Sequence, residues 1–101
     1  MKVCAMQLET TLGNREANFG KIRSLFASAM ADKPDVIVLP ELWDVGFYPD
    51  NVSQLADADG RQAKKLLQDL ARRHDVNIVG GSVAELRQDK VRNTNVVIDR
   101  Q

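Results

Sequence analysis

Residues 35–40 read Asp-Val-Ile-Val-Leu-Pro, an almost unbroken apolar run. A strand with one face in water alternates apolar and polar residues, whereas a strand covered on both faces does not, and such strands are typical of parallel sheets. The β-branched residues of the run favour a strand over a helix. Because parallel strands are joined by long and usually helical connections, this segment predicts an α/β fold.

Helical patterns occur on both sides of the run. The first starts at Asn14, a favourable N-cap, and ends at Asp32-Lys33-Pro34, because proline cannot continue the hydrogen-bond ladder of a helix. The second extends from Gly60 to Arg73 and has cations near its C-terminus, where they suit the helix dipole. Both repeat apolar residues every three or four positions. These residues are Phe19, Ile22, Leu25, Phe26, Ala29 and Met30 in the first pattern, and Ala63, Leu66, Leu67, Leu70 and Ala71 in the second.

Three further segments have the apolar content of strands, namely Val3–Leu8, Val76–Val83 and Asn93–Ile98. A polar turn at residues 87–90 separates the last two. The predicted order is therefore β-α-β-α-β-β, with the first three strands parallel and the last two forming an antiparallel hairpin. Such a sheet needs a covering layer on each face, and the sequence ends at residue 101 just after a strand, so we expect an incomplete architecture.

The charges and the cysteine count exclude several classes of protein. Lys and Arg number 14 and Asp and Glu number 14, so no net charge attracts nucleic acid or an anionic membrane. One cysteine and one histidine cannot form an intrachain disulfide or a zinc-ligand cluster. No run is long and apolar enough for a signal-peptide core or a membrane span. We therefore expect a cytoplasmic protein that uses no metal or other cofactor.

Glu41 is the first candidate for chemistry, because ligands of open α/β sheets bind at the carboxyl ends of parallel strands. It comes directly after the buried run, and partial desolvation there would suit its carboxylate to general-base work. A solvated carboxylate, or one that caps a helix, is the alternative. Position alone leaves both interpretations open.

Residues 41–54 contain many turn-forming residues and no periodicity, which predicts a long loop. Three aromatic residues of this loop, Trp43, Phe47 and Tyr48, are candidates for lining a substrate pocket. Aromatic side chains also anchor loops of this kind to a core, so an anchoring role stays open for each of them.

Four other features predict structure rather than chemistry. Cys4 lies in the first predicted strand, where a small buried thiol is expected rather than a nucleophile. His74 ends the second helix and is expected to complement the helix dipole or to lie at the surface. Lys90 is expected to be a solvated cation in the hairpin turn. Gly80-Gly81-Ser82 matches no phosphate-binding loop, and glycines within a strand more often permit close packing.

Several of these residues occur together in an order that resembles a known family. The residues concerned are Ala5-Met6-Gln7, Asn18, Asp35–Leu42 with Gly46-Phe47, Leu70-Ala71, Gly80-Gly81-Ser82 and Asn93-Thr94. Together they resemble the N-terminal part of the nitrilase superfamily, the carbon–nitrogen hydrolases. The stretch Pro-Glu-Leu-Trp-Asp-Val-Gly-Phe at residues 40–47 is most similar to the branch that contains ω-amidase-like enzymes. Its Pro-Glu-Leu element after an aliphatic strand is the most specific part.

The resemblance implies an α-β-β-α sandwich and hydrolysis of non-peptide carbon–nitrogen bonds, such as those of small amides, by a Glu-Lys-Cys triad. In that chemistry the cysteine attacks the carbon, the lysine stabilises the oxyanion, and the glutamate, which Glu41 matches, is the general base. The lysine and cysteine motifs would follow residue 101. Residues 1–101 are therefore expected to be part of a single domain and inactive alone. Family members commonly associate, so we also expect a homo-oligomer.

Asn93 and Thr94 match a family element near the hairpin, for which we expect local side-chain bonds to the backbone and no catalytic role.

Two alternatives from other functional classes stay open. A truncated or relic α/β module could persist by self-association that covers its exposed sheet face and edge. A flavodoxin-like module would instead bind a small ligand at the same strand ends.

Overall fold

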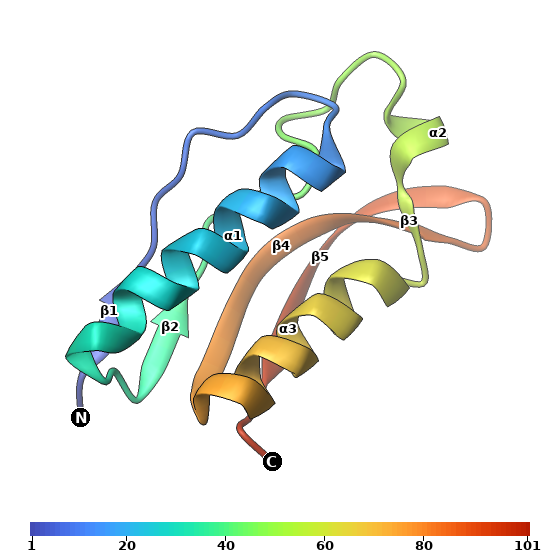
Figure 1. The fold of residues 1–101 in the computed structure, drawn as a ribbon. Helices are drawn as coiled ribbons and strands as arrows, with labels where there is room; N and C mark the ends of the chain where they lie inside the picture. The colour runs from blue at the N-terminus through green and yellow to red at the C-terminus, as the bar shows by residue number, and fades with distance from the viewer.

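The computed structural model describes residues 1–101, and its elements alternate in the predicted order (Figure 1). They are β1 (Val3–Ala5), α1 (Arg15–Ala29), the 3₁₀ turn η1 (Met30–Asp32), β2 (Val36–Val38), α2 (Val52–Leu55), β3 (Asp57–Ala58), α3 (Arg61–His74), β4 (Asn77–Arg87) and β5 (Lys90–Ile98). The predicted α/β class and β-α-β-α-β-β order are confirmed. The short elements α2 and β3 are additions, because four and two residues are too few to produce a recognisable period.

The sheet has the predicted pairing. β1 pairs with β2 and β2 with β4, both parallel, and β4 pairs with β5 as an antiparallel hairpin. β3 adds a short parallel pairing to the distal half of β4, with Asp57 opposite Glu85. The hairpin closes through the two residues Gln88 and Asp89, since Arg87 lies opposite Lys90.

The strand lengths differ from the predicted ones for identifiable reasons. β2 ends at Val38 rather than Pro40, because proline has no N–H to donate and the chain turns there toward β4. β1 ends at Ala5 rather than Leu8, since its neighbour stops at the same level. β4 continues to Arg87 because β5 pairs with it along its whole distal half, including polar residues that interrupt the apolar pattern.

A side chain caps the start of each long helix. The side chain of Asn14 accepts a hydrogen bond from the N–H of Ala17 at 3.0 Å, as expected of an N-cap. At α3 the residue before the helix is Gly60, and the cap comes instead from buried Asp57, whose oxygens accept from the N–H groups of Gln62 and Ala63 at 3.1 and 2.9 Å. A carboxylate also suits the positive end of the helix dipole.

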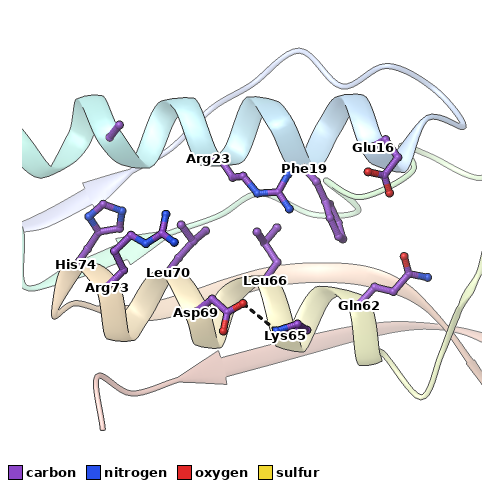
Figure 2. A pocket seen from close by; sticks show the side chains of 11 residues that line it. Glu16, Phe19, Arg23, Gln62, Lys65, Leu66, Asp69, Leu70, Arg73 and His74 are labelled. Atoms are coloured by element: carbon purple, nitrogen blue, oxygen red, sulfur yellow. Dashed lines mark hydrogen bonds and ion pairs between the residues drawn. The ribbon is translucent and has the colours of Figure 1, made fainter.

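α1 and α3 lie side by side on one face of the sheet, and the main core lies between the helices and the strands (Figure 1). A groove of about 410 Å³ separates the two helices (Figure 2). Phe19, Leu66 and Leu70 form its floor, and charged side chains line it, including the pair Lys65 and Asp69 at 3.2 Å. None of its lining residues belongs to the loop that carries Glu41.

The other face of the inner strands carries no helix (Figure 1). Val3 pairs with Val36, and Val38 with Val79, which in turn pairs with Val97, so these side chains share that face. Val3 and Val97 are 55% and 68% exposed. The inner strands therefore present a contiguous aliphatic surface, which we call the open face.

A backbone irregularity in β4 connects it to the end of β2. The register shifts between Val79 and Ser82, and Gly81 has a φ of +58°. A Cβ atom at Gly81 would lie 1.9 Å from the carbonyl oxygen of Pro40. Glycine is thus required here by conformation and by space, and the close-packing role predicted for the strand glycines is confirmed.

We predict that Gly81→Ala lowers the free energy of unfolding by at least about 2 kcal/mol, since the Cβ atom meets backbone in a left-handed conformation. Urea unfolding followed by circular dichroism measures the change. The matched control is Gly20→Ala, because Gly20 lies within α1 and a Cβ there meets nothing within 4 Å. This control should gain about 0.5–1 kcal/mol from helix propensity. Equal effects of the two substitutions would contradict the close contact.

Candidate active site

Glu41 lies at the carboxyl end of β2, directly after Pro40, and its side chain is exposed. Its Oε2 atom accepts a hydrogen bond from Nδ2 of Asn93 at 2.9 Å. An open hollow of about 340 Å³, which we call the Glu41 hollow, is lined by Glu41, Gly81, Ser82, Asn93 and Asn95. The predicted position at the strand end is confirmed, whereas the partial desolvation expected from the buried strand is absent because nothing in these residues covers the carboxylate.

The backbone after Glu41 is held by β4. Leu42 has a φ of +49°, a conformation that costs energy in a residue with a branched side chain. Its N–H donates to Oγ of Ser82 at 3.0 Å, and the N–H of Ser82 donates to the Pro40 carbonyl at 3.3 Å. These contacts hold the strained turn and direct the Glu41 side chain away from the core.

Trp43 is fully buried. Its indole N–H donates to the Gly80 carbonyl at 2.7 Å, and its ring packs against Phe19 with the centroids 5.5 Å apart. Trp43 therefore anchors the loop to the core, which is one of the two roles that the sequence left open for it. Phe47 and Tyr48 are 68% and 53% exposed and do not line the Glu41 hollow, so their contact with a substrate stays a prediction.

Asp44 is a fully buried carboxylate in the same loop. Its two oxygens accept from the N–H of Ala84 at 3.3 and 3.2 Å, and Nη2 of Arg15 lies 4.0 Å away. Desolvation by burial raises the pKa of Asp44 above its ordinary value, although the Ala84 N–H and the Arg15 charge act in the opposite direction. Asp44 thus fixes the loop to β4 at the expense of burying a charge.

Asn18 connects the loop to α1. It is fully buried, and its carboxamide makes three hydrogen bonds: Oδ1 accepts from the N–H of Thr11 at 2.7 Å, and Nδ2 donates to the carbonyls of Thr11 and Asp44 at 2.9 and 2.8 Å. A buried amide with all these groups satisfied rigidifies its surroundings. The Asn18 side chain therefore holds both the segment before α1, at Thr11, and the loop after β2, at Asp44.

The other candidates lie where the sequence placed them. Cys4 is a free thiol in β1, half-buried against the core. His74 is the last residue of α3, half-buried, with its ring centroid 6.1 Å from that of Phe26. Lys90 is exposed at the start of β5. No group of three or more His, Cys, Asp or Glu side chains is arranged to hold a metal ion, and no helix has the length and apolar character needed to cross a membrane.

Sequence reasoning missed most of what supports Glu41. Asn93 and Thr94 were expected to bond to nearby backbone, but they donate to the carboxylates of Glu41 and Glu85. Asp44 and Ser82 lie in stretches that resemble the nitrilase superfamily, and that resemblance was the one available indication for them. Chemically, the Glu41 hollow offers one carboxylate able to accept a proton among neutral polar side chains.

We predict that Asp44→Asn becomes more stable relative to the wild type as the pH rises. Below the ordinary pKa of 3.8, Asp44 is protonated in both folded and unfolded chains. As the pH rises through the raised pKa, the folded wild type must ionise a buried group and loses stability, whereas the variant does not. Urea unfolding of both proteins in a pH series from 3.8 to neutrality measures the difference. Asp50→Asn, in an exposed residue of the same loop, controls for removal of a carboxylate. A stability difference that stays constant with pH would exclude the raised pKa.

Comparisons with known proteins identify the family of the chain. A model of the carbon–nitrogen hydrolase family matches residues 2–101. The chain is 36% identical over 99 residues to the 2-oxoglutaramate amidase of Bacillus subtilis, a match that covers 98% of this chain and 38% of that protein. It is 25% identical over 107 residues to an omega-amidase of Saccharomyces cerevisiae, covering 98% and 37% of the two chains. The chain thus spans less than two fifths of the length of these relatives.

Solved structures share the fold. A nitrilase-superfamily protein of Saccharomyces cerevisiae superposes with a TM-score of 0.88 at 23% identity, over 99% of this chain and 40% of that one. The amidase of Nesterenkonia superposes with a TM-score of 0.84 at 20% identity, over 99% and 40%. At these identities the likeness shows the fold alone, and the family follows from the match over residues 2–101. The chain belongs to the carbon–nitrogen hydrolase family, of whose nitrilase fold it forms a part.

Proposed function

We propose that residues 1–101 supply the general base of an amidase that hydrolyses the carbon–nitrogen bond of a small-molecule amide. The observation that supports this most is the placement of Glu41. It lies at the carboxyl end of a central parallel strand, its backbone is held by β4, and its carboxylate lines an open hollow. A carboxylate so placed is accessible to a substrate and to groups that approach from outside these residues.

The proposed chemistry uses a cysteine and a lysine from residues outside 1–101. The thiol transfers its proton to Glu41 while the sulfur attacks the amide carbon, and the lysine stabilises the oxyanion. Ammonia leaves with the proton that Glu41 held. Glu41 then deprotonates a water molecule, which attacks the thioester, and Glu41 returns this proton to the cysteine sulfur as the acid leaves. The relatives support this assignment: two are amidases, and the Nesterenkonia amidase has an active-site cysteine to which acrylamide adds.

A hybrid enzyme tests the proposal. The segment of the Bacillus subtilis 2-oxoglutaramate amidase that aligns with this chain is replaced by residues 1–101. We predict that the hybrid releases ammonia from small ω-amides and that Glu41→Gln lowers its kcat at least about a hundredfold, as expected for loss of a general base. The ammonia assay measures both.

The matched control in the hybrid is Glu16→Gln, because Glu16 is an exposed glutamate in the first turn of α1, away from the Glu41 hollow. It should keep full activity. Circular dichroism and size-exclusion chromatography establish that each hybrid folds. A folded hybrid that keeps its activity after Glu41→Gln would refute the assignment of the base.

The open face favours a second role, self-association, which we propose for residues 1–101 when they occur without a covering layer. Exposed aliphatic patches of this kind are typical of interfaces. We predict that Val97→Lys shifts the chain toward the monomer in sedimentation velocity, because a charge there must be desolvated on association. The control Leu12→Lys changes a side chain that is 62% exposed and lies outside the open face. A chain that is monomeric at all concentrations before substitution would rule out this role.

The cytoplasmic location and the homo-oligomeric state of the complete enzyme are further proposals; the first is motivated by the single cysteine.

A further inference from the structure

Asn93 and Thr94 are adjacent in β5 and therefore point to opposite faces of the sheet. Thr94 lies opposite Val83, which belongs to the core beneath the helices. Asn93 lies opposite Ala84, which belongs to a second cluster formed with the loop after β2. The two side chains thus have separate surroundings, and each contacts a different carboxylate.

Thr94 fixes the register of β5. Its Oγ1 donates to Oε1 of Glu85 at 3.1 Å, and Glu85 is only 1% exposed. The other oxygen of Glu85 accepts from Nη2 of Arg87 at 3.2 Å. A buried carboxylate needs its donors. Because a slip of one residue moves every side chain of a strand to the other face, it would remove this donor from Glu85 and turn Asn93 away from Glu41.

On the other face, Nδ2 of Asn93 donates to Oε2 of Glu41 at 2.9 Å, across 52 positions of sequence. This is the one hydrogen bond that the Glu41 carboxylate makes in the chain. Bonds to an ionised acceptor are strong and directional. Oε2 of Glu41 is therefore held by β5, while Oε1 accepts no hydrogen bond.

The chemical type of residue 93 also matters. A lysine or arginine in its place would hold the carboxylate but would favour its ionised form and so oppose its uptake of a proton. A neutral carboxamide donates without adding a fixed charge. We propose that Asn93 is a positioning residue that orients the Glu41 carboxylate for proton transfer. The inference rests on the proposed function of Glu41 and adds to it a second residue, from a different strand.

The contact is tested first without any enzyme assay. In residues 1–101 labelled with ¹⁵N, Glu41→Gln should shift the side-chain amide resonances of Asn93, because it replaces the carboxylate that accepts from Nδ2. The Asn95 amide, which donates to the Gly81 carbonyl, should be little affected. Asn93 resonances that are indifferent to Glu41→Gln would overturn the inference.

Kinetics in the hybrid enzyme test the positioning role. Asn93→Asp keeps the size of the side chain but loses the donor and sets a second carboxylate against Glu41. We expect it to lower kcat about ten- to a hundredfold, with KM nearly unchanged, as for loss of a hydrogen bond to a charged group. A role in packing alone would tolerate this isosteric change. The matched control is Asn51→Asp, since Asn51 is exposed and its side chain caps nothing.

The outcomes separate this inference from the proposed function. Wild-type kcat in a folded Asn93→Asp hybrid would overturn the positioning role while leaving Glu41 as the base. Retained activity in Glu41→Gln would instead remove the proposed function, whatever the amide resonances show. If Asn93→Asp does not fold, Asn93→Ser is measured in its place, and kcat equal to the wild type in that variant would overturn the inference.

Discussion

The contact between the Pro40 carbonyl and Gly81 is the constraint on which the placement of Glu41 depends. There is no room between the end of β2 and β4 for even one methyl group. The absence of a side chain lets the two backbones approach until the N–H of Ser82 reaches the Pro40 carbonyl and its hydroxyl accepts from the N–H of Leu42. The strained turn at Leu42 follows from this approach, and it brings the Glu41 side chain out of the core.

The two faces of the sheet have different roles. The helix-covered face provides stability, because Trp43 and the apolar residues of α1 and α3 form the main core there. The distal part of the other face is covered by the loop after β2 and by α2. In this loop, Asp44 accepts a hydrogen bond from the N–H of Ala84. The inner strands of that face remain uncovered, and the Glu41 hollow opens beside them. The groove between α1 and α3 is separate from the Glu41 hollow, because only residues of these two helices line it.

The sequence was sufficient to predict the features that depend on apolar patterns and on local helix signals. The succession of strands and helices along the chain, both long helices and the parallel pairing follow from the apolar runs, from the helical periodicity, and from Asn14 and Pro34, each of which acts locally. It also placed Glu41 at the correct strand end. It could not predict that Asp57 would cap α3 from four residues before the helix, or that Asn93 would reach Glu41 across 52 positions. Such contacts depend on tertiary geometry, and an isolated polar residue carries no period that would reveal them.

Within residues 1–101, the contacts that hold Glu41 in place come from Gly81 and Ser82 in β4, Asn93 in β5 and the buried anchors Trp43 and Asp44. Glu41, the proposed general base, and its support therefore lie within one structural unit. Recombination between relatives at the boundary of this unit would exchange the residues that follow it without disturbing the orientation of the Glu41 side chain. The groups that complete the proposed site would then change while the position of the Glu41 carboxylate stays the same.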